Sequence, residues 1–261
     1  MFVSPDGTPL AALTARVRDL WEHLAGVSPG FDPTPAVAVS PRSYLCPPGW
    51  VGIVVIGDAA LATAPDRESA RLVGQALAGL PAASLTSVSV LAGRLPVAGS
   101  LGPAALAYLD PADFRPWPGD AIITPLHLDH PGLRQFLLTA DAEELEESGL
   151  QEITTPAFAV QEDDRVVAAA GYRDWPRGTA HLGVMTARAA RGRGLARAAA
   201  SAAVAHAVSE NKLPQWRSRP EPSRRAARAL GFRELGSQVS IRLHGGTAPV
   251  GPDVCGRTPA P

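Results

Sequence analysis

The chain has 261 residues, 46% of them hydrophobic, which is enough to build two compact domains or one large one. Its formal net charge of −1 at pH 7 gives no overall attraction to nucleic acid or to an anionic membrane surface. The only two cysteines, Cys46 and Cys255, favour neither a structural disulfide nor a zinc site.

Targeting and membrane signals are absent from the pattern of residues. The apolar stretch 50–64 is too short for a membrane span and is interrupted by Gly57 and Asp58. The first residues, with Pro5 and Asp6, do not have the form of a signal peptide. We therefore expect a cytoplasmic protein that does not bind a membrane.

Residues 1–118 are predicted to form a smaller N-terminal α/β domain. Apolar periodicity predicts helices at 10–24 and 67–80 and strands at 51–56 and 88–91. The glycine-containing loop 99–102 has no neighbouring residues typical of a ligand motif. We expect this domain to serve packing, assembly such as a homodimer, or the shaping of an acceptor site.

A domain boundary is predicted at 114–119, where three prolines or glycines interrupt the chain, so that a second domain spans 119–243. Within it the pattern predicts strands at 121–128, 156–161, 166–172 and 180–186 and helices at 132–139 and 142–148. The polar residues 162–165 indicate a turn between two of these strands.

The most informative stretch is the loop Arg191-Gly192-Arg193-Gly194-Leu195-Ala196, between an apolar strand and a buried alanine-rich helix at 195–208. The first amides of a helix lack intrahelical partners and the helix dipole is positive there, which favours a bound phosphate. Two common phosphate motifs do not fit. A dinucleotide loop needs a small residue where Arg197 stands, and the single lysine, Lys212, is not in a P-loop.

The elements after this helix continue the same pattern. A strand is predicted at 213–217 and a helix at 223–232, with Ser223 as its N-cap and Gly231 in a left-handed conformation at its end. Residues 232–243 are predicted to close the domain as a hairpin that turns at Gly236 and Ser237. The remaining residues 244–261 are rich in glycine and proline and predict a flexible tail.

The segment 181–243 resembles the coenzyme A-binding half of the GCN5-related N-acetyltransferase (GNAT) family. Arg191, Gly194 and Ala196 match the family motif Gln/Arg-x-x-Gly-x-Gly/Ala, and a helix ending in Leu230-Gly231-Phe232 follows in the family's order. The resemblance covers about 121–243 and is specific from His181 onward. It implies an α/β (α+β) fold with a mixed, mostly antiparallel sheet flanked by helices.

The resemblance also implies acetyl-CoA as acyl donor and an amine of a small molecule or protein as acceptor. The family's fourth strand would pair with the pantetheine arm through Val184, Met185 and Thr186. Around the pyrophosphate, the implied contacts come from the amides and side chains of Arg191, Gly192, Arg193, Gly194, Leu195, Ala196 and Arg197. Any of the arginines could pair with the ribose 3′-phosphate.

The expected general acid is missing. Family members often carry a tyrosine five residues before the phenylalanine of Leu-Gly-Phe and an asparagine shortly upstream, where this chain has Ala227 and Pro220. His181 is the best candidate base, because its ordinary pKa near ~6.5 suits proton transfer. Tyr172 and the acidic run that contains Glu147 are weaker candidates, and a solvated helix face also explains the acids.

Three functions therefore remain open. An N-acetyltransferase comes first, and the departure at Ala227 keeps open an acyl-CoA-binding or sensing protein with little catalysis. A nucleic-acid-binding module using the arginines between 188 and 228 is disfavoured by balancing acids and by the lack of interleaved aromatic residues. No metal site is expected, since His127 and His130 stand without a further cluster of ligands.

Overall fold

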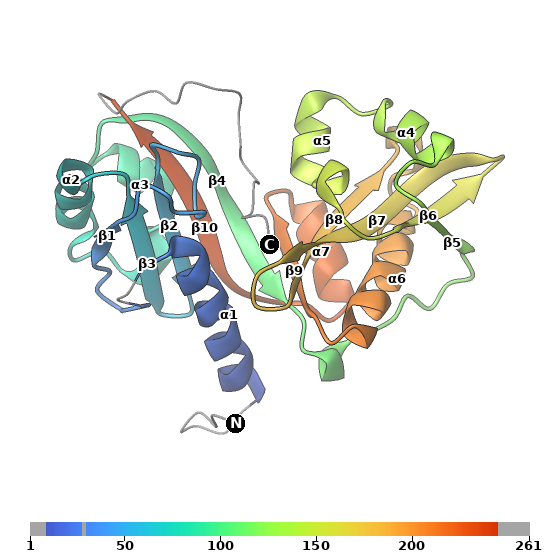
Figure 1. The fold of residues 1–261 in the computed structure, drawn as a ribbon, viewed down its shortest axis with the longest axis horizontal. Coiled ribbons are helices and arrows are strands. Elements are labelled where there is room, and N and C mark those ends of the chain that lie inside the picture. The colour runs from blue at the N-terminus through green and yellow to red at the C-terminus, as the bar shows by residue number, and fades with distance from the viewer. Residues whose placement is uncertain (1–8, 28–29, 245–261) are drawn as a thin grey trace. The chain divides into compact units, whose positions relative to one another are not determined.

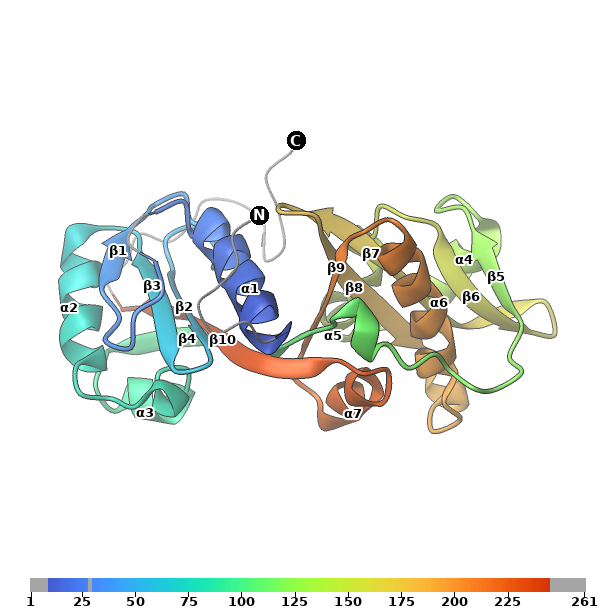
Figure 2. The ribbon, with the colours of Figure 1, turned by 90° about the horizontal axis from the view of Figure 1, so that it is seen from below.

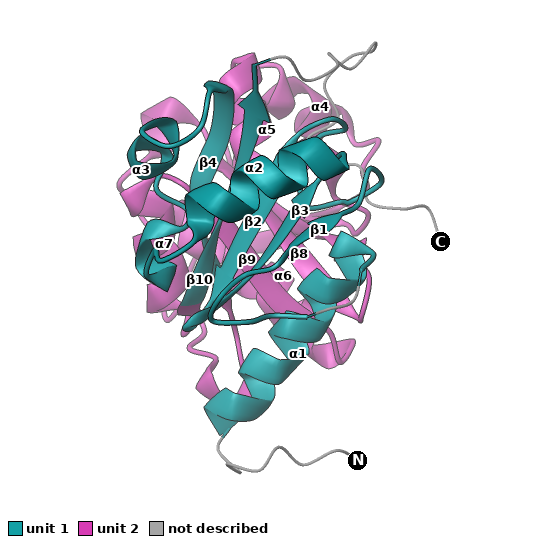
Figure 3. Cartoon of the chain, turned by 90° about the vertical axis from the view of Figure 1, so that its left-hand side faces the viewer, with its two compact units in different colours: residues 1–106, 235–261 teal, residues 107–234 magenta. Residues whose placement is uncertain are grey.

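The computed structural model describes residues 9–27 and 30–244. These residues form two compact units (Figures 1 and 3): one contains the described residues up to 106 and from 235 onward, and the other spans 107–234. This division differs from the predicted domains 1–118 and 119–243, because the last strand returns to the first unit. The predicted tail at 244–261 lies, apart from His244, outside the described residues.

The first unit is a sheet with helices packed on it. Its strands run in the order β1-β3-β2-β10-β4. Their bounds are β1 Val37–Val39, β2 Val51–Ile56, β3 Ala59–Ala64, β4 Val97–Tyr108 and β10 Arg233–Leu243, and the helices are α1 Pro9–Ala25, α2 Arg67–Leu77 and α3 Val88–Ala92, with a short 3-10 turn at Ala82–Ser84. β1 pairs with β3 in parallel, whereas the pairs β2 with β3 and β10 with β2 are antiparallel.

Two predictions for this unit are wrong. The stretch 88–91, predicted as a strand, lies in helix α3, because Val88, Leu91 and Leu95 repeat at helical spacing and pack into one apolar cluster. The loop predicted at 99–102 lies inside strand β4. Strands β1, β3 and β4 were not predicted from the sequence.

The hairpin predicted at 232–243 is also wrong, since these residues form the single strand β10. Gly236 is not in a turn: it pairs with Ile56, and a Cβ on it would overlap the carbonyl oxygen of Val55. The glycine is therefore needed for close approach of two backbones.

The second unit is a mostly antiparallel sheet covered by helices on both faces. Its strands are β5 Ile123–Leu126, β6 Ala157–Glu162, β7 Arg165–Trp175, β8 Thr179–Thr186 and β9 Leu213–Ser218, and its helices are α4 Pro131–Leu137, α5 Ala142–Ser148, α6 Leu195–Ser209 and α7 Glu221–Ala229, with 3-10 turns at Pro111–Asp113, Leu150–Glu152 (η3) and Arg188–Ala190 (η4). The strand order is β9-β8-β7-β6-β5, and only β8 with β9 is parallel.

The alanine-rich helix α6 fills one face of this sheet. It lies along β6, β7 and β8 (Figure 2), where Ala199, Ala200 and Ala203 are fully buried. Small side chains let the helix axis lie close to the sheet. On the opposite face, α4, α5 and η3 cover a second cluster that contains Leu133, Leu150 and other apolar residues. The elements predicted for this unit are present, with ends that differ by a few residues.

One capping prediction is wrong. α7 begins at Glu221 after Pro220, and Ser223 lies inside the helix. Its hydroxyl oxygen accepts a hydrogen bond from the indole Nε1 of Trp216 at 3.0 Å, so this serine stabilises a buried tryptophan instead of a helix end. Gly231 does adopt a positive φ, of 98°, as predicted.

Candidate functional site

The glycine loop after β8 leads into the start of a helix, as its sequence predicts. Gly192 and Gly194 have φ values of 80° and 82°, and Gly194 is the N-cap of α6. The amides of Arg197 and Ala198 bond to the Gly194 carbonyl, which leaves the amides at the start of the helix without partners inside it. An anion placed there would meet several amide donors and the positive end of a 15-residue helix.

Strands β8 and β9 separate on the approach to this loop. Their parallel ladder runs from Thr179 paired with Leu213 to His181 paired with Gln215 and ends there. β8 nevertheless continues to Thr186, paired throughout with β7. From Leu182 onward, therefore, the backbone groups of β8 that point away from β7 are available to an extended ligand.

The three residues predicted to pair with pantetheine lie on this separated part of β8. Met185 is buried among the residues under α4, and Val184 packs against the cluster under α6. The hydroxyl of Thr186 is buried and has no partner among the described residues. Their side chains are thus mostly committed to the core, and any contact with a ligand falls to the backbone and to this hydroxyl.

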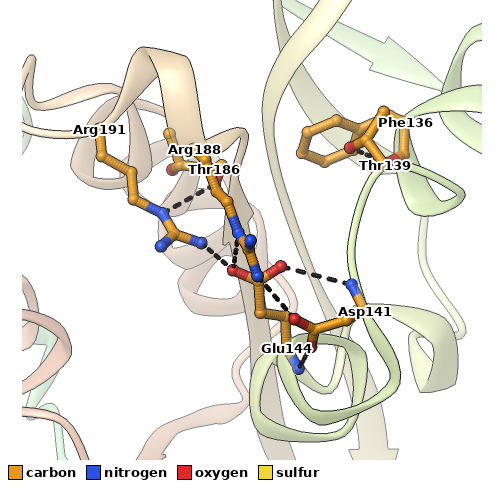
Figure 4. A network of polar contacts seen from close by, with 7 residues as sticks. All are labelled: Phe136, Thr139, Asp141, Glu144, Thr186, Arg188 and Arg191. Atoms are coloured by element: carbon orange, nitrogen blue, oxygen red, sulfur yellow. Dashed lines mark hydrogen bonds and ion pairs between the residues drawn. The ribbon is translucent and has the colours of Figure 1, made fainter.

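Arg188, in the turn before the glycine loop, and Arg191, in the loop, are bonded to carboxylates. Figure 4 shows Glu144 of α5 accepting from the Nε of Arg188 at 2.9 Å and from the Nη2 of Arg191 at 2.5 Å. Arg188 also reaches Asp141, whose side chain caps α5 together with Glu144 in a capping box. The hydrogen bonds from Arg188 and then Arg191 lower the pKa of Glu144 to about 2. Arg191, the arginine of the family motif, therefore connects the glycine loop to α5.

Arg193 and Arg197 differ in their partners. Arg193 forms a two-pronged pair with Glu162 at the end of β6, and this pairing lowers the pKa of that glutamate. Arg197 forms no ion pair with any described residue. Its guanidinium instead lies 4.1 Å from the ring centre of Trp117, and its Nε is buried without a hydrogen bond to the described part of the chain.

Trp117 is the site residue that sequence reasoning missed. Its amide donates to the hydroxyl of Ser201 on α6 at 2.9 Å, and a Cβ on Gly194 would lie 2.7 Å from its ring. Its indole Nε1 is buried with no partner among the described residues. The prolines around it predicted a linker, although a large aromatic residue in a linker is itself a sign of packing.

His181 lies where β8 and β9 part. Its Nδ1 is 2.9 Å from the side-chain oxygen of Gln215, and its ring stacks on Trp175 with centres 4.2 Å apart. Burial, and then the charge of Arg217, lower the pKa of His181 to about 4. The imidazole is therefore neutral at pH 7.

The other two catalytic candidates are not beside His181. Tyr172 pairs across the ladder with Leu182, so it points to the opposite face, where its hydroxyl lies 2.9 Å from Nδ1 of His206 on α6. Burial, followed by nearby acids, raises the pKa of Tyr172 to about 12, so the phenol stays protonated. Glu147 accepts hydrogen bonds from the amide and guanidinium of Arg219.

The acidic run is largely neutralised by arginines. Besides the pairs of Glu144 and Glu147, Glu152 pairs with Arg173 at 2.8 Å, whereas Glu143 and Glu146 are exposed. These contacts favour a structural role for most of the carboxylates over attraction of a cationic amine. At the two positions where the family pattern departs, Ala227 is buried in the core and Pro220 precedes α7.

The two histidines near α4 do not form a metal site. The imidazole of His130 caps α4 by accepting from the amide of Gly132 at 3.1 Å. Within residues 9–27 and 30–244, no three His, Cys, Asp or Glu side chains gather as a metal would require. None of the helices in that part of the chain combines the length and apolarity needed to cross a membrane.

Solved structures of several acetyltransferases are similar to this chain at low identity. A protein from Novosphingobium aromaticivorans described as a GNAT-family acetyltransferase is 22% identical, with a TM-score of 0.41, over 56% of this chain and 65% of its own. A GCN5-related N-acetyltransferase from Kribbella flavida is 21% identical, with a TM-score of 0.46, over 61% and 64%. This chain thus spans less than two thirds of either.

A GCN5-related N-acetyltransferase-like protein from Streptococcus suis is 14% identical, with a TM-score of 0.45, over 73% of this chain and 83% of its own. No curated protein matches the chain. The model of the GNAT acetyltransferase family matches residues 155–237, which include β8, the glycine loop, α6 and the Leu-Gly-Phe turn. Members of this family generally use acyl-CoA donors. Residues 155–237 of this protein are thus similar to the GNAT acetyltransferase family.

Proposed function

We propose that the second unit is an N-acetyltransferase that moves an acetyl group from acetyl-CoA to an amine. The observation that carries this proposal is the separation of β8 from β9 leading directly into the glycine loop at the start of α6. An extended arm with a terminal pyrophosphate fits such a strand edge followed by a helix N-terminus. The family match of residues 155–237 supports the same chemistry.

The residues present fit coenzyme A. Gly194 and Gly192 leave the loop backbone open to an anion, and Thr186 and Trp117 contribute buried polar atoms that lack partners among the described residues. Arg197, held by the indole ring and without a carboxylate from the described part of the chain, is the arginine we assign to the ribose 3′-phosphate. When bound, the thioester supplies an activated acetyl carbonyl.

The chain's own groups would position the reactants and receive one proton. The amine nitrogen forms a bond to the acetyl carbon while the carbon–sulfur bond breaks and the electron pair leaves on sulfur. His181, neutral at pH 7, takes the proton that the amine loses. Ala227 and Pro220 occupy the positions of the family's acid and its neighbour, and neither side chain can donate a proton. We therefore assign protonation of the thiolate to water.

A second candidate, acyl-CoA binding with little turnover, is favoured by the burial of Ala227 at the family's acid position. It predicts tight binding without acetylation of any amine. The nucleic-acid alternative loses support, because Arg188, Arg191, Arg193 and most arginines of α7 are paired with carboxylates. Few cations would remain for a phosphate backbone.

The cofactor site is tested by calorimetry with acetyl-CoA and a pair of variants at one position. A Cβ placed on Gly192 would have nothing within 4 Å, so Gly192→Glu and Gly192→Lys carry the same backbone strain and opposite charges. We expect Gly192→Glu to weaken binding about tenfold or more and Gly192→Lys to keep it, as for an anion at a helix N-terminus. Equal affinities for the two variants would contradict binding of the pyrophosphate here.

Arg197 is tested with CoA and 3′-dephospho-CoA. Arg197→Ala should lower the affinity for CoA about tenfold, which is the size of a charge-assisted hydrogen bond. The affinity for 3′-dephospho-CoA should be almost unchanged. Arg225→Ala, on the exposed side of α7, is the control. Thiol release from acetyl-CoA in the presence of a panel of primary amines then distinguishes the acetyltransferase from the acyl-CoA-binding protein. Binding of acetyl-CoA without thiol release in the presence of any amine would favour the binding protein.

A further inference from the structure

A row of three polar side chains crosses the sheet where β8 and β9 part. His181 Nδ1 lies 2.9 Å from Oε1 of Gln215, and Nε2 of Gln215 lies 3.0 Å from the hydroxyl of Tyr108, the last residue of β4, which belongs to the second unit. Gln215 and Tyr108 are both 0% exposed. The position is the last paired one of the ladder, so the row is anchored by backbone pairing on one side.

Burial of a primary amide needs an explanation. An amide taken from water without hydrogen bonds costs about 1–3 kcal/mol by mutational measures, so a buried glutamine is retained only where its groups are bonded. Here its oxygen is bonded to His181 and its nitrogen to Tyr108. Both polar ends of Gln215 are thus used in this row, which ends at the imidazole.

The direction of these bonds decides which ring nitrogen carries the proton. The amide nitrogen of Gln215 donates to Tyr108, so its oxygen, which can only accept, faces the imidazole. Nδ1 of His181 must then be the donor and carry the proton. In the neutral ring, Nε2 consequently holds the free lone pair.

We propose that Gln215, supported by Tyr108, is a positioning residue that holds His181 as the neutral tautomer protonated on Nδ1, so that Nε2 accepts the proton from the acceptor amine. This rests on the proposed function of the second unit. It assigns a role to two fully buried residues, Gln215 and Tyr108.

The choice of an amide over a carboxylate fits this role. A carboxylate at position 215 would stabilise the imidazolium and oppose release of the proton after each turnover. The hydrogen bond that His181 donates to the Gln215 oxygen raises the pKa of His181 less than burial and the charge of Arg217 lower it. Arg173, a neighbouring charge, is paired with Glu152. The uncharged ring of Trp175 covers one face of the imidazole. The amide therefore orients the imidazole and leaves it neutral.

The test is nitrogen NMR of the full chain with labelled histidine, in the absence of any ligand, from pH 5.5 to 8. We expect His181 of the wild type to be neutral throughout and protonated on Nδ1. Gln215→Leu should give a mixture of tautomers, and Gln215→Glu should raise the pKa of His181 far enough for the imidazolium to appear within this pH range. Protonation on Nε2 in the wild type, or an unchanged tautomer in Gln215→Leu, would overturn the proposal.

Controls separate positioning from loss of packing. Gln238 is a buried glutamine of the first unit whose amide bonds to Leu45, so Gln238→Leu removes a comparable group elsewhere and should leave the His181 signals unchanged. Tyr108→Phe removes only the hydroxyl and should give a smaller change than Gln215→Leu. If Gln238→Leu changed the His181 signals more than Gln215→Leu, the effect would come from general destabilisation. This result would count against a positioning role for Gln215.

Kinetics distinguish this proposal from the proposed function. With acetyl-CoA and the first amine that the panel identifies, Gln215→Leu should lower kcat about tenfold, a fraction of the roughly 10²–10⁴-fold that general base catalysis contributes, and change the KM for acetyl-CoA less than twofold. If His181→Ala leaves turnover unchanged, the base and its positioning residue are both overturned, while acetyl transfer itself stands. If no amine is acetylated but the tautomer is as expected, the proposed function fails and the role of Nε2 fails with it.

Discussion

Glu144 shows how a single carboxylate can organise the glycine loop from outside it. Its side chain bonds to Arg188 and Arg191, and it closes the capping box of α5 (Figure 4). Both arginines are more than half exposed, so solvent and salt weaken these pairs. The residue is better suited to holding the loop in place than to attracting a substrate.

Replacement of Glu144 should alter stability in a pH-dependent way. Its pKa is about 2 in the folded protein against an ordinary value of 4.5, so its pairs stabilise the fold above about pH 4.5 and are lost as pH falls toward 2. We therefore expect Glu144→Gln to be less stable than wild type at pH 7, with the difference vanishing near pH 2. Urea unfolding across this range measures it.

Glu146, exposed on the same helix, gives the matched control for this experiment. Glu146→Gln should change the free energy of unfolding by less than about 0.5 kcal/mol at any pH, as surface substitutions usually do. A difference for Glu144→Gln that persists at pH 2, or that is no larger than that of Glu146→Gln, would show that the arginine pairs do not contribute.

The two loop glycines allow a separate test of conformation and packing. Alanine at either position incurs the left-handed penalty of about 1–2 kcal/mol. Only at Gly194 would the added Cβ also meet Trp117, at 2.7 Å. We expect Gly194→Ala to cost about 1–3 kcal/mol more than Gly192→Ala, a typical cost of overpacking, and to shift the fluorescence of Trp117. Equal losses of unfolding free energy would mean that the indole moves aside freely.

At the scale of elements, helix α6 both fills the core and presents its N-terminus to the loop. Its burial on the sheet depends on alanines, because Ala199, Ala200 and Ala203 are completely inaccessible. Larger side chains there would lift the helix from β7 and displace its first turn, where the free amides lie. Packing at the middle of the helix therefore contributes to the geometry of the site.

Substitution of one alanine on each side of α6 separates packing from helix propensity. Ala203→Leu should lower the free energy of unfolding by about 1–3 kcal/mol through overpacking and should also weaken acetyl-CoA binding. Ala205→Leu, on the exposed face, should have almost no effect, since leucine and alanine are both good helix formers. Thermal unfolding and calorimetry give the two readouts, and an equal effect of both variants would contradict this account.

At the scale of the whole molecule, the chain returns to its first unit at the end. β10 pairs with β2 over six residues, and Val239, Ile241 and Leu243 complete the apolar cluster of that unit (Figure 3). The first 106 residues thus lack part of their own core until the last strand is in place. This long-range pairing makes folding of the first unit depend on residues more than 170 positions away.

Ile241→Ala tests this dependence. Removal of a fully buried isoleucine should cost about 2–5 kcal/mol. Hydrogen exchange should become faster in β2 and β3, whose sheet contains β10, and change least in β6 and β7. Arg242→Ala, at the exposed neighbouring position, should leave exchange as in wild type. Faster exchange confined to the second unit would contradict the assignment of β10 to the first.

The sequence by itself determined the local features of this protein: the glycine loop at the start of a helix, the left-handed conformation of Gly231, the buried alanine-rich helix and the order of elements from β5 to α7. These follow from periodicity and from conformations that only glycine adopts readily. Glu147 and Tyr172 were candidates for catalysis because sequence does not show which face of a strand or which arginine a side chain meets.

Only the tertiary structure decided the long-range features. It placed Trp117 on the loop, Ser223 under Trp216, and Gly236 against Val55 instead of in a turn. It also brought Gln215 next to His181, 34 positions away in sequence, and Tyr108 next to Gln215, 107 positions away. Such contacts depend on strand register and on side-chain burial between distant segments, which local propensity does not encode.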